Sequence, residues 1–153
     1  MTEVTEADRA AFFEEVAAAS AKAVWCALAT VRGSGDRAEP RVRIVHPTWE
    51  GDVLWLATGP ATPKARQMAA NPMVDIQFQV APPDFRHIMV RGRAELCMDD
   101  ATRQHAWDAL DYDLKDFFPG GPADPNYVAI RITPSRVELS DMFGSVNKRV
   151  WRA

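Results

Sequence analysis

Strand-like segments joined by short turns limit the fold of this chain more than any other feature. In residues 73–80 (MVDIQFQV) every second residue is apolar, which is typical of a strand with one buried face. Comparable segments are predicted at residues 24–31, 40–45, 53–58, 87–96, 127–132 and 136–140. Because short connections favour antiparallel neighbours, we expect a mainly β fold with flanking helices, in which a six- to seven-stranded antiparallel sheet curls into a barrel.

Three helices are predicted to interrupt these strands, at residues 5–22, 62–70 and 99–115. The second has clear boundary signals: Thr62 can cap its first turn, Pro63 suits the first helical position, and Asn71-Pro72 ends it. The sequence contains no linker or repeat, and 153 residues are an ordinary length for one domain. We therefore expect a single domain over residues 1–153.

Charge and composition exclude several classes of function. A formal net charge of −3 argues against nucleic-acid binding, which needs a surplus of cations. No apolar run approaches the roughly 20 residues that span a membrane, so we expect no membrane partner. The acidic N-terminus does not resemble a secretory signal, and Cys26 and Cys97 are isolated. We expect free thiols in the cytoplasm and no metal site.

The charges of the helix at residues 62–70 point to an anion. Lys64 lies at its N-terminal end, where the helix dipole favours negative charge. The hydroxyls of Thr58 and Thr62, the first free N–H groups and the Lys64 ammonium can form an anion pocket. If residues 40–45 and 53–58 form a tight antiparallel hairpin, Arg43 reaches the same anion. Together these groups suit a phosphate monoester.

Each of these residues also has a purely structural interpretation. Lys64 and Arg66 can be solvated helix charges, and Arg41 can pair with acidic residues across the sheet. Gln77 and Gln79, on the next strand, can address a heterocycle attached to the phosphate or can simply be the wet face of that strand.

The block from residue 40 to residue 78 (PRVRIVHPTWEGDVLWLATGPATPKARQMAANPMVDIQF) adds a resemblance to this chemistry. It contains an R-x-V strand, a strand ending in Thr, and the pattern [ST]-x-K-x-x-x-[LIM]-x-x-N-P before the next strand. In this order it resembles the pyridoxamine 5'-phosphate oxidase-like, FMN-binding split-barrel superfamily, especially its general stress protein 26-like branch. The resemblance covers residues 24–80 in detail and implies an FMN-binding split barrel.

The resemblance also implies roles for particular residues. It implies that Arg43 grips the FMN phosphate and that Thr58, Thr62 and Lys64 contact the phosphate from the other side. Gln77 falls near the position that contacts the flavin ring from the neighbouring subunit. Ile44 and Val45, which follow Arg43, complete the predicted cofactor-binding residues. The family forms homodimers with the cofactor at the interface, so we expect a homodimer. The resemblance also implies a flavin-dependent oxidoreductase that acts on a small molecule.

The sequence departs from true pyridoxamine-phosphate oxidases in two places. Residues 136–142 (RVELSDM) lack the R-L-H-D-R type ending that holds the substrate phosphate, and Pro63 replaces a basic residue. The substrate is therefore expected to differ, and its identity stays open. No nucleophile–base arrangement stands out, and the three histidines are separated. We expect Trp49 or Trp151 near the mouth of the pocket, because both fall at predicted barrel rims.

Two alternatives to an FMN-dependent enzyme remain. One is a related reductase that uses a deazaflavin, which similar scaffolds bind in a cationic groove. The other is a non-catalytic module that binds flavin or haem, with His46 or His87 as a haem ligand.

Overall fold

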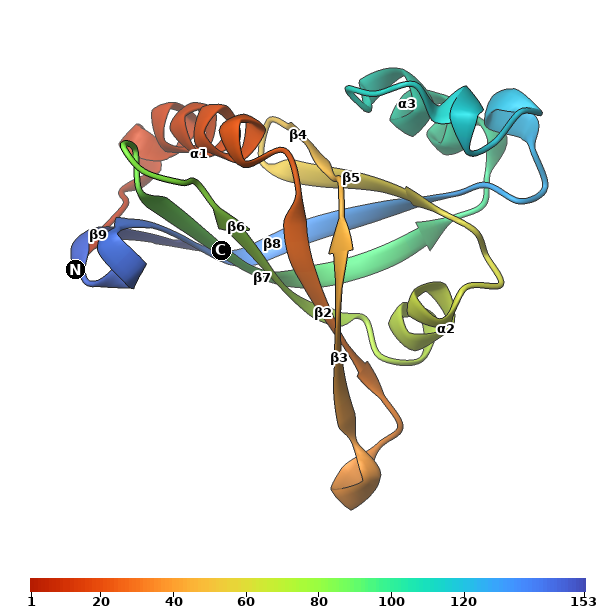
Figure 1. The fold of residues 1–153 in the computed structure, drawn as a ribbon, viewed down its shortest axis with the longest axis horizontal. Helices are drawn as coiled ribbons and strands as arrows, with labels where there is room; N and C mark the ends of the chain where they lie inside the picture. Colours follow the sequence, from red (N-terminus) through yellow and green to blue (C-terminus); the bar gives the residue numbers. More distant parts are fainter.

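A computed structural model describes residues 1–153 and confirms a mainly β fold with flanking helices (Figure 1). The strands are β1 (Thr2–Glu3), β2 (Cys26–Arg32), β3 (Glu39–Val45), β4 (Thr48–Glu50), β5 (Val53–Thr58), β6 (Met73–Gln79), β7 (Arg86–Cys97), β8 (Val128–Asp141) and β9 (Val146–Arg152). The helices are α1 (Arg9–Ala23), α2 (Pro63–Ala70) and α3 (Asp100–Ala109). The sheet curls without closing, as in a split barrel.

The strands form one sheet in the order β1-β9-β8-β7-β6-β2-β3, and β5, which also pairs with β4, joins it through β8. All pairs are antiparallel except β1 with β9. The structure has nine strands rather than six or seven, because β1, β4 and β9 were not predicted. Two predicted strands are also one: residues 128–141 run continuously as β8.

Proline explains the apparent break in β8. Pro134 has no N–H group and therefore suggests a turn in the sequence. In the structure it lies where β8 changes partner on one edge, from β5, whose pairing ends at Ile132, to β9, whose pairing begins at Arg136. On the other edge β8 stays paired with β7, and a register shift at Arg91/Gly92 absorbs the irregularity.

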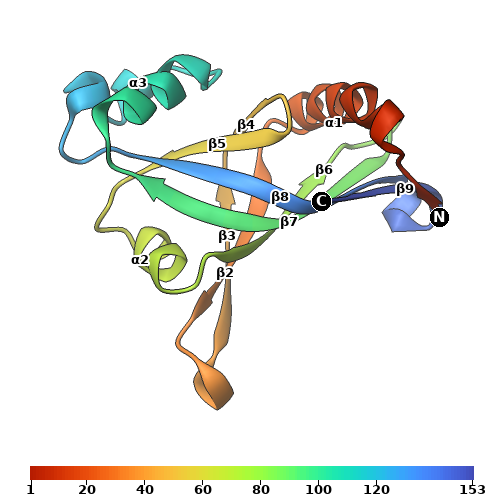
Figure 2. The same ribbon diagram turned by 180° about the vertical axis from the view of Figure 1, so that it is seen from behind.

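The predicted hairpin between residues 40–45 and 53–58 is wrong. After β3 the chain turns into the short strand β4, and β4 rather than β3 pairs with β5. The strands β3 and β5 therefore diverge, and the sheet is open between them (Figure 2). This opening, and not a continuous ladder, positions the candidate site.

The helices pack against the sheet at three places. Helix α1 contributes Phe12, Phe13 and Val16 to the main core of 23 buried residues. Helix α2 lies beside the protruding β2–β3 hairpin, and its Met68 joins the same core. Helix α3 is capped by Asp99 and packs with the following loop on a second, smaller core. It ends at residue 109, earlier than predicted.

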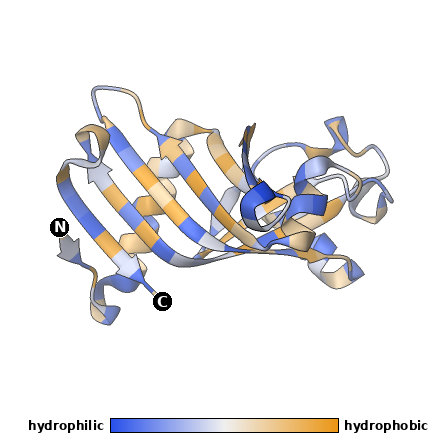
Figure 3. Cartoon of the chain, turned by 90° about the horizontal axis from the view of Figure 1, so that it is seen from below, coloured by the Kyte–Doolittle hydropathy of each residue, from blue (hydrophilic) through white to orange (hydrophobic).

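One face of the sheet carries an exposed apolar patch. The colours of neighbouring residues alternate along the strands in Figure 3, as expected when one face packs inward. The outward residues of β3, however, are Val42 and Ile44, which are 67% and 69% exposed. Their neighbours on β2, Ala29 and Ala27, are only half-buried. Residues 24–31 are apolar on both sides of their strand, but this chain covers only one of the two sides.

Candidate functional site

A groove of about 610 Å³ lies in the opening between β3 and β5. Its walls come from β3, β5, the start of α2 and the segment that follows α3. It is lined by Trp25, Ile44, Val45, His46, Leu56, Ala57, Thr58, Gly59, Thr62, Lys64, Tyr112, Phe117 and Phe118. One end of this lining is polar and the other is aromatic.

The polar end contains three of the predicted site residues. The hydroxyl oxygens of Thr58 and Thr62 lie 3.2 Å apart. The Thr62 hydroxyl donates to the Gly59 carbonyl at 2.8 Å and accepts from the Ala65 N–H at 3.4 Å, so it caps α2 as expected. That cap occupies the Ala65 N–H, which is therefore not free to bind an anion. Lys64 supplies the positive charge of this end.

Arg43 lies beside the groove rather than in its lining. Its guanidinium donates to the Thr30 hydroxyl at 2.6 Å and to the Gln67 side-chain oxygen at 2.9 Å, so β2 and α2 fix its position. Burial, and then the charge of Arg41, lowers the pKa of Arg43. Arg43 lines a second groove, which lies between the β2–β3 hairpin and α2.

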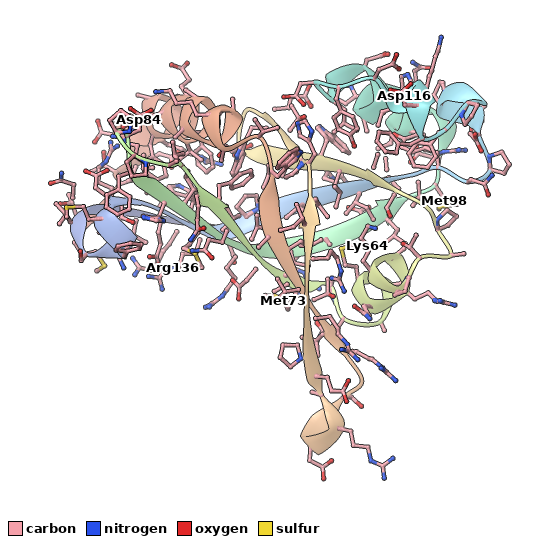
Figure 4. The ribbon with its side chains drawn as sticks, viewed as in Figure 1. Lys64, Met73, Asp84, Met98, Asp116 and Arg136 are labelled. Carbon is pink, nitrogen blue, oxygen red and sulfur yellow. The ribbon has the colours of Figure 1, made fainter.

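Lys64 and Arg43 form a positive centre without a carboxylate partner. Burial lowers the pKa of Lys64, and the nearby charge of Arg43 lowers it further. Neither residue takes part in any of the 16 ion pairs of the structure. Figure 4 places Lys64 between β3 and α2, and the charge of Arg43 acts on it there. Two partly desolvated like charges are a favourable environment for an anion.

The aromatic end was not predicted. His46 stacks on Tyr112, with ring centroids 4.4 Å apart, and its Nε2 lies 2.9 Å from Asp111 Oδ1. Trp25 and Phe117 flank them and are 64% and 66% exposed. The density of aromatic residues in YDLKDFF (112–118) was the available signal, but only the fold shows that this segment reaches β3.

The two tryptophans expected at the mouth lie elsewhere. Trp151 is 5% exposed and packs edge-to-face on Phe13 in the main core. Trp49 packs against the same core and donates its indole N–H to the Ser20 hydroxyl at 3.0 Å. That prediction was wrong, because both rim strands turn these side chains inward.

The remaining predicted residues lie on β3 and β6. Ile44 and Val45 line the groove, Ile44 from the exposed side and Val45 from the buried side. Gln77 is half-buried on the outer face, two strands away from Ile44 and in register with Ala27. It does not line the groove of its own chain.

Other reactive groups do not form a further centre. No group of three or more histidine, cysteine or acidic side chains has the arrangement of a metal site. Cys26 and Cys97 are free and buried, and burial raises the pKa of Cys26 to about 12. None of the helices is long and apolar enough to cross a membrane.

Comparison with known families agrees with this geometry. Residues 12–141 match the family model described as pyridoxamine 5'-phosphate oxidase. The chain belongs to the pyridoxamine 5'-phosphate oxidase family. Since the match runs from α1 to the end of β8, it includes both walls of the groove. No curated protein matches the chain.

Solved structures with the same fold carry related names. General stress protein 26 from Bacillus anthracis has a TM-score of 0.71 at 23% identity, over 93% of this chain and 98% of its own. A pyridoxamine 5'-phosphate oxidase-related, FMN-binding protein from Nostoc punctiforme has a TM-score of 0.61 at 19% identity, over 86% and 85%. An F420 reductase has a TM-score of 0.60 at 27% identity, over 78% and 93%.

Proposed function

We propose that this family member binds FMN in the groove between β3 and β5 and acts as a flavin-dependent oxidoreductase on a small molecule. The observation that carries the proposal is a positive centre without a carboxylate partner: Lys64 at the polar end of a largely apolar groove, and Arg43 beside that end. Family membership and the FMN-binding relative from Nostoc punctiforme support it.

The side chains fit the two halves of FMN. Lys64, Thr58 and Thr62 would hold the phosphate, and Arg43 would complete its charge from the β3 side. Ile44 and Val45 would lie along the ring, which the aromatic end suits by stacking. When bound, the flavin supplies hydride or electron transfer, while this chain supplies binding, orientation and exclusion of water.

A homodimer is part of the proposal. Val42, Ile44 and Trp25 expose a large apolar surface at the edge of the groove, and such surfaces usually mark an interface. Gln77 lies on the same face and would contact the flavin of the partner subunit, as the family resemblance implies. A second copy packed on this face would bury the patch and close the groove.

The substrate differs from pyridoxamine phosphate in this proposal. Arg136, in the region that matches the substrate-binding ending of the oxidases, pairs with Glu138 at 2.5 Å. Glu138 is also 3.2 Å from Lys148. Glu138 therefore engages both cations near this end of β8 and would compete with a substrate phosphate for them. The two buried thiols suit the reducing cytoplasm, where we place the protein.

Absorbance spectroscopy and FMN titration test the central claim. The purified protein should carry a flavin spectrum or gain one when FMN is added. Lys64→Glu and Arg43→Glu should each abolish binding, because a charge-assisted contact of about 1.5–3 kcal/mol is replaced by repulsion. Arg37→Glu, which changes a charge at the tip of the same hairpin, serves as the control. A wild-type protein that stays colourless, or charge-reversed variants that bind normally, would refute the proposal.

A deazaflavin cofactor is the second candidate, because the F420 reductase shares 27% identity with this chain. Competition between FMN and the deazaflavin for the wild-type protein separates the two. Displacement of FMN by a smaller concentration of deazaflavin would assign the groove to the latter. A bound flavin that accepts no electrons from nicotinamide donors would instead favour a non-catalytic binding role. Neither His46, which faces Asp111, nor His87, which is buried beside Phe143, supports haem binding.

A further inference from the structure

A histidine–aspartate pair lies at the aromatic end of the groove between β3 and β5, which we call the cofactor groove. His46 follows β3 and lines this groove, and its Nε2 lies 2.9 Å from Asp111 Oδ1. The Thr48 hydroxyl donates to the same Asp111 oxygen at 2.9 Å and accepts from the Asp111 N–H at 3.2 Å. The start of β4 therefore holds this carboxylate in place beside His46.

The carboxylate fixes which nitrogen of His46 carries the proton. Because a carboxylate only accepts hydrogen bonds, the neutral imidazole presents its N–H at Nε2, and Nδ1 becomes an acceptor. No hydrogen bond within the chain uses this Nδ1. It is also not among the buried side-chain atoms that lack a partner, which belong to His87, Arg103 and Arg136. The Nδ1 atom of His46 is therefore accessible to a ligand.

The ring of His46 separates the cofactor groove from a smaller pocket of about 250 Å³ beside α1. His46 lines both cavities, whereas Asp111 lines only the smaller pocket. The Nε2 edge of the ring is thus on the pocket side, and the opposite edge is on the groove side. Tyr112 stacks on one face of the ring, with centroids 4.4 Å apart, and limits its rotation.

The flavin ring offers one group that matches a hydrogen-bond acceptor. In the oxidised ring only N3 carries a hydrogen, whereas N1, N5 and the two carbonyl oxygens accept hydrogen bonds. With the phosphate at Lys64, the ring extends toward the aromatic end, where His46 lies. We propose that Nδ1 of His46 accepts a hydrogen bond from flavin N3–H, and that Asp111 positions the imidazole for this contact. The inference rests on the proposed function, because it adds a contact to the same site.

Titrations with FMN and 3-methyl-FMN test this contact, because the methyl group replaces the N3 hydrogen. The wild-type chain, freed of flavin, should bind FMN about tenfold more tightly than 3-methyl-FMN. His46→Leu should bind FMN about tenfold more weakly than the wild type does, and its affinities for the two ligands should agree within about threefold. Flavin fluorescence reports binding without any assay of activity.

Three further variants separate the contact from a general loss of packing. In His46→Asn the amide oxygen can take the place of Nδ1, so this variant should regain a preference for FMN over 3-methyl-FMN. Asp111→Ala keeps Nδ1 but releases the imidazole, so its preference should lie between those of the wild type and His46→Leu. His105→Leu is the matched control, because His105 forms the same kind of pair with Glu50, at 2.8 Å, outside the groove lining. It should keep the preference of the wild type.

The preference for FMN over 3-methyl-FMN decides the assignment. An equal preference in the wild type and in His46→Leu would overturn it and leave the proposed function intact, because the methyl group would then meet another part of the site. A wild type that binds both flavins equally would overturn it in the same way. Failure of FMN to bind the wild type is a separate result, which contradicts the proposed function and with it this contact.

Discussion

Lys64 and Arg43, in the proposed phosphate site, should lower the stability of the free protein. Each is partly removed from water and neither has a carboxylate partner, so their charges are poorly compensated without a ligand. Natural proteins accept such local costs where function requires them. The same two residues should therefore respond in opposite directions when stability and ligand binding are measured.

The variant Lys64→Met should separate these effects. It retains the apolar stem and removes the charge, so the free protein should melt about 2 °C higher. FMN binding should weaken by tenfold or more, because the phosphate loses a charged donor. Thermal unfolding and FMN titration of the same preparation measure both. Lys22→Met provides a control, since Lys22 pairs with Asp84 at the surface and should not change FMN affinity. A Lys64 variant that melts lower than the wild type would contradict this view of the site.

The lowered pKa of Lys64 also predicts a dependence of stability on pH. Between that pKa and the ordinary value of 10.5, the unfolded chain binds more protons at this position than the folded protein. The free energy of unfolding of the apoprotein should therefore contain a contribution that rises with pH across this window. Urea unfolding of wild type and Lys64→Met at several alkaline pH values measures this contribution, which is the difference between the two free energies of unfolding. Parallel pH profiles for the two proteins would remove the basis of the prediction.

At the residue scale, the sequence located the residues that are close together in the chain. Thr58, Thr62 and Lys64 form one local motif, so their grouping could be predicted before the fold was known. Trp25 and Tyr112 could not be found in this way, because 86 residues of chain lie between segments that meet only in the fold. The sequence also could not show that Trp151 is buried, because burial depends on which way the strand turns its side chains.

At the scale of an element, the first turn of α2 depends on a single cap. Thr62 has the extended backbone of an N-cap, and its hydroxyl is the acceptor for the Ala65 N–H. Thr62→Ala should lower the free energy of unfolding by about 1 kcal/mol and weaken FMN binding, because the helix start is then less ordered. Thr62→Ser retains the hydroxyl oxygen and should keep most of the stability and most of the FMN affinity. Urea unfolding and FMN titration check the pair; equal behaviour of the alanine and serine variants would exclude a role for the hydroxyl.

The β7–β8 ladder depends on a close approach at Gly92. A Cβ atom at this position would lie 2.7 Å from the Thr133 carbonyl oxygen and 3.2 Å from Pro134 Cα. Because these are backbone atoms of the paired strand, Gly92→Ala should destabilise the fold by about 2 kcal/mol. Arg93→Ala, at the exposed neighbouring position, should cost less than about 0.5 kcal/mol. Chemical denaturation measures both, and a Gly92 variant of wild-type stability would show that the strands can separate without cost.

Local patterns recovered most elements but not their pairing. The alternation of residues 73–80 and the cap at Thr62 are short-range signals, and both elements formed as predicted. The pairing of β5 with β8 joins residues at least 70 positions apart, for which the sequence offers no comparable signal. The wrong prediction of a hairpin between β3 and β5 has the same cause. The two strands are close along the chain, but β5 pairs with the distant β8 instead.

For the whole molecule, the exposed face of β2 and β3 is the main support for the proposed homodimer. Val42 and Ile44 occupy the outward positions of a strand whose inward positions include Arg41 and Arg43. The strand β3 therefore has its polar side toward α2 and its apolar side toward solvent. This arrangement is the reverse of an ordinary surface strand, and it becomes favourable when a second copy covers the apolar side.

Val42→Glu should therefore shift the protein from dimer to monomer, because a buried carboxylate without a partner is strongly unfavourable at an interface. Val42 does not line the cofactor groove, so any accompanying loss of FMN affinity would act through the partner subunit. Met98→Glu, which changes an apolar side chain of 57% exposure outside β2 and β3, is the matched control. Sedimentation velocity measures the oligomeric state, and FMN titration of the same samples measures the coupling. If Val42→Glu remains dimeric, the proposed interface is on the wrong face; if it becomes monomeric with unchanged FMN affinity, each groove is complete within one chain.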